Sequence, residues 1–187
     1  MRRSKSHTRS KILDAAYGLM WRQGFLRVSM DEIAERADVT KRTLYQHFTS
    51  KDELLAATLA LSSELAIERL QAFPRSASAN ETIDAFFGDL AAWAAKPRWS
   101  GGGFTRVVME LADLKGHPAR AIAKKHKLAV ERWLADVLAV ARVASASARA
   151  REIMLLTEGA MALMLIHGDR SYAGAAAHAA KLLIQRG

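Results

Sequence analysis

The stretch from residue 29 to 53 constrains the fold of this chain more than any other, because it places several helix boundaries close together. Two serines in it are each followed three residues later by a glutamate, the pattern of a capping box; the pairs are Ser29 with Glu32 and Ser50 with Glu53. A helix is predicted to begin directly after each serine. The segment between them has room for a helix of about two turns, with Thr40 as its N-cap. Two short helices joined by a tight turn are typical of a helix-turn-helix.

The second short helix has one apolar side and one side rich in hydrogen-bond donors. Leu44 and Phe48 lie four residues apart and are predicted to share a small core with the preceding helix. The outward positions carry long polar side chains and no acid; they are Lys41, Arg42, Tyr45 and Gln46. Such a face suits a groove of double-stranded DNA. A basic face on a short helix can equally be a solvated surface, and helix-turn-helix geometry also occurs in proteins that do not bind DNA.

Several runs of residues in this region resemble the tetracycline-repressor (TetR) family of bacterial transcriptional regulators. They are TLYQHF at residues 43–48, IAERADVTK before it, SKDELL after it and RSKILDAAYGLMWRQGF upstream. Their order and spacing match the family over about the first quarter of the chain. The resemblance implies a homodimeric, DNA-binding regulator of cytoplasmic location in a bacterium.

Two groups of residues are the expected DNA contacts. Side-chain length and donor pattern suggest that three residues reach base edges; they are Lys41, Arg42 and Gln46. The match to family positions, together with the two helix N-termini, implies contacts to the DNA backbone; these residues are Ser29, Thr40, Thr43, Tyr45, His47 and Lys51. Without the motif, His47 would be interpreted as a surface or capping histidine.

The sequence departs from the common family pattern at two positions. Asp38 in the turn and Arg42 in the recognition helix stand where many members have glycine. Asp38 must therefore adopt whatever backbone conformation the turn requires, which aspartate tolerates better than most residues. Arg42 adds a potential contact to a base or a phosphate, so the operator sequence is not predictable.

Positive charge is concentrated where the motif lies. The chain has a formal net charge of +9, and residues 1–52 carry 11 Lys and Arg against 6 Asp and Glu. We therefore expect a DNA-binding domain over residues 1–52 and an effector-binding and dimerisation domain over residues 53–187. Residues 1–8 form a basic arm that is predicted to be disordered in the free protein and could follow phosphates in a groove.

The composition also excludes several classes of protein. There are no cysteines, so disulfides and thiolate metal sites are excluded. The apolar stretch after the arm is interrupted by Asp14, which argues against a secretory signal. No apolar run approaches the ~20 residues that a bilayer requires, so we expect a soluble cytoplasmic protein without a membrane partner.

The whole chain is predicted to be all-α, with about nine helices and no strands. Besides the helix-turn-helix, the expected helices cover about residues 8–23, 51–70, 80–95, 104–114, 118–142, 148–166 and 171–185. Gly24 is the expected left-handed stop of the first helix, Pro118 the first residue of the seventh, and Ser78 with Glu81 a third capping box. A connector is expected around residues 73–80.

The last two helices have wide apolar faces that are expected to need more cover than one chain offers. The resemblance implies that they pair with their symmetry mates in a four-helix dimer interface; the candidate residues are Ile153, Leu156, Ala160, Met164, Ala176, Ala180 and Leu183. Alternatively, these residues complete the core of the protomer. A two-fold dimer would place two recognition helices on a palindromic operator.

Aromatic and methionine side chains in the second domain could line an apolar pocket for an unknown small-molecule effector. The candidates are Phe86, Trp93, Trp99, Phe104, Met109, Glu158, Met161 and Met164. Residues of these types at helical spacing also form ordinary cores. Glu158 stands out as a lone carboxylate in an apolar run, where it would need a partner, a cationic ligand or exposure to solvent.

Catalysis and bound cofactors are not expected. The six histidines lie at no metal-ligand spacing, and the glycine run at 101–103 lacks the lysine and preceding strand of a phosphate-binding loop. The favoured function is a homodimeric repressor released from its operator by a ligand. The alternative is an effector-independent nucleoid or adaptor protein, which would show steep salt dependence and little preference for an operator.

Overall fold

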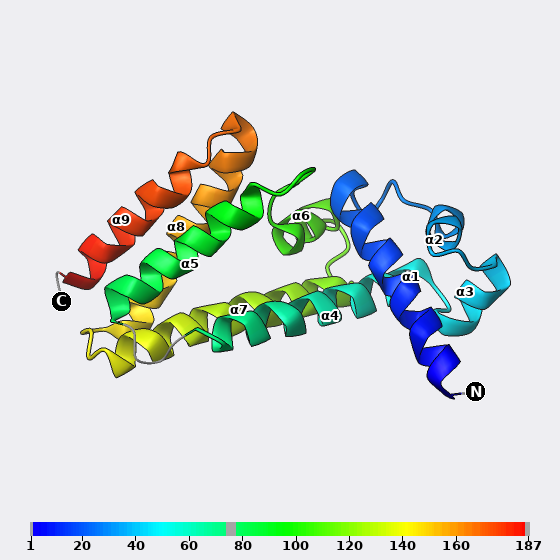
Figure 1. Ribbon diagram of the computed structural model, residues 1–187, viewed down its shortest axis with the longest axis horizontal. Helices are drawn as coiled ribbons and strands as arrows, with labels where there is room; N and C mark the ends of the chain where they lie inside the picture. Colours follow the sequence, from blue (N-terminus) through cyan, green and yellow to red (C-terminus); the bar gives the residue numbers. More distant parts are fainter. Residues whose placement is uncertain (1, 74–77, 186–187) are drawn as a thin grey trace. The chain divides into compact units, whose positions relative to one another are not determined.

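The computed structural model describes residues 2–73 and 78–185, with side chains from residue 5 onward. Within these ranges the chain is all-α, as predicted, with nine helices and no strand (Figure 1). The helices are α1 (Arg2–Gln23), α2 (Met30–Arg36), α3 (Lys41–His47), α4 (Lys51–Gln71), α5 (Ala79–Ala94), α6 (Gly103–Glu110), α7 (Pro118–Val140), α8 (Ala146–His167) and α9 (Ser171–Gln185). The connector predicted around residues 73–80 lies partly outside the described residues.

The predicted helix N-termini are capped by the side chains that the sequence indicates. Both Ser29 and Ser78 form complete capping boxes with the glutamate three residues later, which confirms these two predictions. The capping box predicted for Ser50 and Glu53 differs in one bond. The Ser50 hydroxyl accepts the Glu53 N–H at 3.1 Å, but the Glu53 carboxylate accepts the N–H and hydroxyl of Thr49, both at 2.7 Å, instead of reaching back to Ser50.

The first helix corrects one prediction and confirms another. Residues 2–8 of the basic arm, which was expected to be disordered, belong to α1; they contain no proline or glycine, and Arg and Lys favour helices. Gly24 ends the helix in the left-handed region, at φ 91°, as predicted. Its N–H donates to the Met20 carbonyl at 2.9 Å.

The first of two compact units consists of the residues up to Leu65 together with Gly103–Lys125. Its core combines residues of α1 to α4 with five from the later segment; these five are Phe104, Val107, Leu111, Ala119 and Ala123. The helix-turn-helix therefore shares one apolar core with α6 and the first turns of α7. This shared core was not predictable from the sequence, since these segments are about 50 residues from the motif along the chain.

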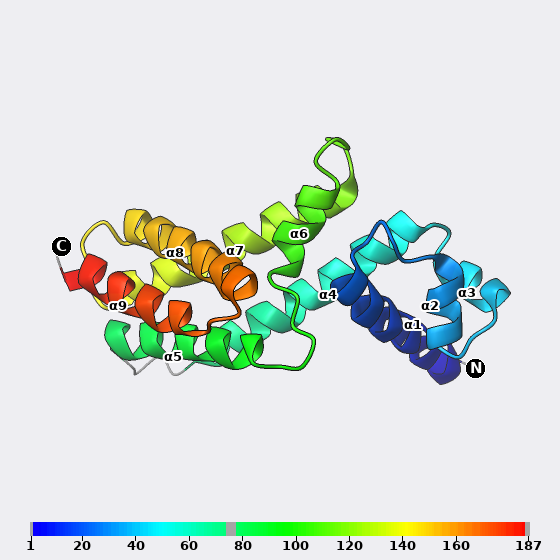
Figure 2. The ribbon, with the colours of Figure 1, turned by 90° about the horizontal axis from the view of Figure 1, so that it is seen from above.

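The second unit consists of Ala66–Gly102 and the residues from His126 onward. In it, α5, α8 and α9 run side by side (Figure 2). Four helices contribute to its main core, and its fully buried side chains include Ile83 and Phe87 of α5 and Leu134 of α7. The division of function at residue 52 stays a prediction. None of the helices, so far as the structure describes them, is both long and apolar enough to span a bilayer.

Candidate nucleic-acid interface

The turn between α2 and α3 is held by backbone bonds and by one residue in a left-handed conformation. Asp38 has φ 55°, the region that glycine adopts most easily, which explains why an aspartate is tolerated at this position. The next residue, Val39, donates its N–H to the Ala34 carbonyl at 3.0 Å. Thr40 then caps α3, since its hydroxyl accepts the Thr43 N–H at 3.1 Å. The turn thereby fixes the direction of α3.

The two sides of α3 divide as the sequence predicts. Leu44 and Phe48 are buried in the core of the first unit, at 0% and 1% exposure. The four outward residues are all exposed; they are Lys41, Arg42, Tyr45 and Gln46. From the other side, the Arg9 guanidinium of α1 lies 5.1 Å from the centre of the Phe48 ring. A seven-residue helix is thus anchored by two apolar side chains and presents its polar side chains to solvent.

Lys41 already has a partner in the free protein. Its ammonium lies 2.8 Å and 3.0 Å from the two carboxylate oxygens of Asp31 in α2. The hydrogen bond and charge of Asp31 raise the pKa of Lys41, so the ammonium is cationic at neutral pH. To contact a base, Lys41 must exchange this carboxylate for DNA. The pair was not predicted, because the two residues are ten apart and meet only through the turn.

The six candidates for backbone contacts are differently exposed. Tyr45 is exposed, whereas Thr43 and His47 are half-buried, with the His47 ring 6.5 Å from the ring of Phe48. The Thr40 and Thr43 hydroxyls bond to each other at 2.8 Å. Ser29 is occupied by its capping box, in which Glu32 accepts the Ser29 N–H at 2.7 Å; these bonds lower the pKa of Glu32. All six assignments stay predictions.

Lys51 has a structural role in the free protein. Its ammonium donates to the Leu26 carbonyl at 3.3 Å and lies 4.5 Å from the centre of the Phe25 ring. Partial burial lowers the pKa of Lys51, and neighbouring carboxylates, Asp52 first, oppose this shift. A contact between Lys51 and a DNA phosphate would therefore compete with the bond from Lys51 to the Leu26 carbonyl, in the connection between α1 and α2.

The eight effector candidates do not form one pocket. Trp93, Trp99, Met161 and Met164 gather in one apolar cluster of the second unit, with the two tryptophan rings edge to face at 5.6 Å. The other four are separate from it: Phe86 is in the main core of that unit, Phe104 is in the core of the first unit, Met109 is exposed on α6, and Glu158 forms an ion pair with Lys127. The carboxylate of Glu158 thus has a partner without a cationic ligand.

The seven dimer candidates mostly face the interior of the protomer. Ile153, Ala160, Met164, Ala176 and Ala180 are buried within the single chain, and Leu156 and Leu183 are half-buried. The opposite side of α8 carries an exposed stripe with spacing i, i+4, i+7, i+8 and i+11; it consists of Leu155, Gly159, Ala162, Leu163 and Ile166. We call this the α8 stripe. The burial of five of the candidates within one protomer agrees with the alternative that they complete its core, and the dimer interface stays a prediction; both sides of α8 are apolar, so the sequence pattern does not separate the two.

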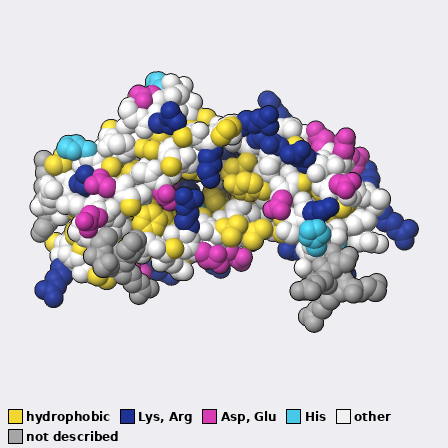
Figure 3. All heavy atoms as spheres, in the orientation of Figure 1, with side chains coloured by type: hydrophobic (Ala, Val, Ile, Leu, Met, Phe, Trp, Pro, Cys, Tyr) yellow, Lys and Arg dark blue, Asp and Glu magenta, His cyan; other side chains and the backbone are white. Residues whose placement is uncertain are grey.

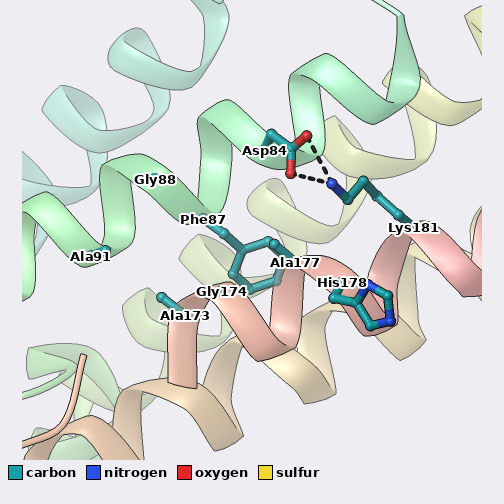
Figure 4. A pocket seen from close by; sticks show the side chains of 9 residues that line it. All are labelled: Asp84, Phe87, Gly88, Ala91, Ala173, Gly174, Ala177, His178 and Lys181. Atoms are coloured by element: carbon teal, nitrogen blue, oxygen red, sulfur yellow. Dashed lines mark hydrogen bonds and ion pairs between the residues drawn. The ribbon is translucent and has the colours of Figure 1, made fainter. Parts of the chain in front are cut away.

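A shallow groove lies between α5 and α9, with a volume of about 260 Å³ (Figure 4). Its lining is mostly small and apolar, with three polar side chains at the rim; the residues are Asp84, Phe87, Gly88, Ala91, Ala173, Gly174, Ala177, His178 and Lys181. Asp84 and Lys181 form an ion pair across it at 2.7 Å. Ala91 and Ala173 also belong to the tryptophan and methionine cluster.

Charge is mixed on the surface that Figure 3 shows, where Lys and Arg side chains lie among Asp and Glu side chains. Within residues 2–73 and 78–185, no three His, Asp or Glu side chains lie close enough together to hold a metal ion. The chemistry that the first unit offers is hydrogen bonding and cationic charge on α3.

Comparison with known proteins agrees with this arrangement. Residues 12–58 match the model of the family described as "Bacterial regulatory proteins, tetR family". The repressor KstR of Rhodococcus jostii is 43% identical over 61 residues, which cover 33% of this chain and 29% of KstR. The activator FasR of Mycolicibacterium smegmatis is 34% identical over 88 residues, which cover 44% of this chain and 40% of FasR. The match thus spans less than half of either relative.

Solved structures extend the similarity over the whole fold. A putative TetR transcriptional regulator from Streptomyces avermitilis is 28% identical, with a TM-score of 0.84 and coverage of 96% of this chain and 97% of that one. Reduced NemR of E. coli has a TM-score of 0.86 at 21% identity, with coverage of 93% and 95%, and supports the fold alone. Residues 12–58 thus match the DNA-binding region of the TetR family of bacterial regulatory proteins, and the nine described helices have the fold of solved TetR-family regulators.

Proposed function

We propose that this chain is a sequence-specific DNA-binding regulator that acts in the bacterial cytoplasm as a homodimeric repressor. The observation that carries the proposal is the outward side of α3, where four long polar side chains are exposed while Leu44 and Phe48 anchor the helix. Lys or Arg can bond to guanine and Gln to adenine in the major groove. Accordingly, Lys41, Arg42 and Gln46 read the bases, and the six other candidates hold the backbone.

Dimerisation through the α8 stripe supports this function. Leu155 and Ile166 are 70% and 72% exposed, and Leu182 of α9 is a further exposed leucine. Burying such a stripe against a second copy removes apolar surface from water. A two-fold dimer presents two copies of α3 about 34 to 36 Å apart, one turn of DNA, and thus favours a palindromic operator.

Repression and release by a ligand form the finer part of the proposal. One relative is named a repressor and the other an activator. In the simplest case a dimer bound over a promoter blocks transcription, so the proposed sign of regulation is repression. The groove between α5 and α9 is the proposed effector site, because its apolar floor adjoins the cluster of Trp93 and Trp99. A ligand that prefers a form with weak DNA affinity then opposes DNA binding reciprocally.

Selection of duplex DNA from a random pool tests the DNA-binding part. The purified protein should enrich a palindrome, and Gln46→Ala and Tyr45→Ala should each weaken binding to it by about tenfold. Gln71→Ala, which removes an exposed glutamine from the end of α4, is the matched control and should bind as the wild type does. Equal binding to the palindrome and to random DNA, with a steep dependence on salt, would favour the effector-independent nucleoid protein instead.

Filling the groove tests the effector site. Gly174 lines the groove, and a Cβ added there meets no atom within 4 Å, so we expect the side chain of Gly174→Leu to reduce the open volume. The apolar fluorescent anion 1-anilinonaphthalene-8-sulfonate should bind the wild type and lose its fluorescence enhancement with this variant. Gly116→Leu, at a glycine that is equally open but lies in the first unit, should retain the signal. An unchanged signal with Gly174→Leu places the dye, and the proposed site, elsewhere.

A further inference from the structure

The connection between α1 and α2 is short, and side chains from distant parts of the chain serve its backbone groups. Glu110 of α6 accepts the Leu26 N–H at 3.1 Å. Arg106 of α6 donates to the Trp21 carbonyl, in the last turn of α1, at 3.1 Å. On the other side, Lys51 of α4 donates to the Leu26 carbonyl. The end of α1 and the path to α2 are thus held by charged side chains that the helix-turn-helix itself does not contain.

The two side chains of α6 are held in a fixed geometry. Arg106 and Glu110 lie one turn apart and pair at 3.0 Å, and both are partly buried, at 34% and 20% side-chain exposure. The helix is seated by Gly103, where an added Cβ would lie 2.1 Å from the Trp21 ring, and by the buried Val107. Each member of the pair therefore reaches one backbone group: the arginine reaches a carbonyl and the glutamate reaches an N–H.

The held segment leads directly into the candidate interface. Leu26 precedes Ser29 by three residues, and Ser29 caps α2 and is a predicted phosphate contact. Gly24, in the same connection, has φ 91°, and a Cβ there would lie 2.7 Å from a carboxylate oxygen of Glu110, so the backbone passes close to this side chain. A shift of the connection moves the N-terminus of α2 relative to α1 and changes the surface offered to DNA.

We propose that Arg106 and Glu110 are positioning residues for DNA recognition, which hold the connection between α1 and α2 in the form that binds the operator. This inference rests on the proposed DNA-binding function and extends it to α6, which carries none of the predicted DNA contacts. The bonds are directional, because a carbonyl needs a donor and an N–H needs an acceptor. Exchange of the two residues keeps the ion pair but removes both bonds to the backbone.

Operator titrations with four variants test the proposal, at a temperature where circular dichroism reports each as fully folded. Glu110→Ala should weaken operator binding by about tenfold, as expected for loss of a charge-assisted hydrogen bond. Glu110→Gln keeps an oxygen for the Leu26 N–H and should stay within about threefold of the wild type. The exchanged pair, R106E with E110R, should bind as weakly as Glu110→Ala. Glu131→Ala, which breaks an ion pair with Arg151 in the second unit, is the control and should have no effect.

Amide hydrogen exchange at Leu26 separates positioning from general stability and does not need DNA. It should be fast in Glu110→Ala and in the exchanged pair, and slow in the wild type and in Glu110→Gln. The inference is overturned if Glu110→Ala binds the operator as tightly as the wild type does. It is also overturned if the exchanged pair binds with wild-type affinity, or if Glu110→Gln binds as weakly as Glu110→Ala. If the wild type selects no DNA sequence, the proposed function fails; unchanged protection of Leu26 in Glu110→Ala would instead overturn the positioning role itself.

Discussion

Lys41 pairs with the carboxylate of Asp31 in the free protein, and under the proposed function it would have to exchange this partner for DNA. Asp31→Asn removes the competing charge, since the carboxylate pairs with Lys41 at 2.8 Å. We expect tighter operator binding by about two- to fivefold, in the range that exposed ion pairs contribute. Titrations at several salt concentrations measure the change. Asp113→Asn, at an exposed aspartate near the end of α6, should leave the affinity unchanged; weaker binding by Asp31→Asn would contradict the competition.

Asp38 carries the strained backbone of the turn. At φ 55°, a β-branched residue is far less favourable than aspartate, so Asp38→Val should lower the free energy of unfolding by about 1 to 2 kcal/mol. Asp38→Gly should be close to neutral, because glycine relieves the strain but has a more flexible unfolded state. Urea denaturation measures both. Asp136→Val, on the exposed side of the regular helix α7, is the control; an equal loss there would show that the turn is not the cause.

At the scale of the helix, α7 holds a buried titratable group in the second unit. Burial lowers the pKa of His126 to about 4, with a further contribution from Lys127 and an opposing one from Glu158. The unfolded chain, with a pKa near 6.5, binds a proton between pH 6.5 and 4 that the folded chain does not. The free energy of unfolding should therefore fall as the pH decreases through this window, by at most about 3 kcal/mol.

Denaturation at several pH values measures this dependence. His126→Gln has no titrating ring and should show a flatter profile between pH 6.5 and 4.5. His178→Gln, at an exposed histidine of the same unit, should keep the wild-type profile. The capping carboxylates of Glu32 and Glu81, whose pKa is lowered by their serine bonds, are common to all three proteins and cancel in the comparison. Identical profiles for His126→Gln and the wild type would exclude His126 as the source.

The elements differ in how much the sequence predicts about them. Capping residues act within one turn, so Ser29, Thr40 and Ser78 mark their helices correctly, and Pro118 does the same for α7. The inward side of α3 was also predictable, because its other side is polar. The buried side of α8 was not predictable, since both sides of that helix carry apolar residues and only its packing against α5 and α9 decides which are buried.

At the scale of the whole molecule, the oligomeric state is the property with the clearest test. Leu155→Asp combined with Ile166→Asp places two charges on the α8 stripe and should convert the protein to monomers in sedimentation experiments, with at least a tenfold loss of operator affinity. Leu114→Asp changes an exposed leucine of the first unit and should remain dimeric. A dimer that survives both substitutions would require a different interface.

Contacts between distant segments are what the sequence does not reveal. The bonds from Arg106 and Glu110 to the end of α1 join residues about 85 apart. Each side chain is unremarkable on its own, and only the packing of α6 against Trp21 brings the charged groups to the backbone atoms they serve. The same holds for Lys41 and Asp31, whose pairing depends on the turn.

The shared core of the first unit limits how the DNA-binding segment of this protein could be exchanged by recombination between genes. A single crossover after residue 65 would transfer α1 to α3 and most of α4 but leave Phe104, Val107 and Leu111 behind, so a foreign α6 would have to fill their places. The glycine at position 103 would have to be transferred as well, because any larger residue there meets the Trp21 ring. A designer who exchanges DNA specificities between regulators of this kind would therefore need to move a discontinuous module, with α6 and the start of α7 included.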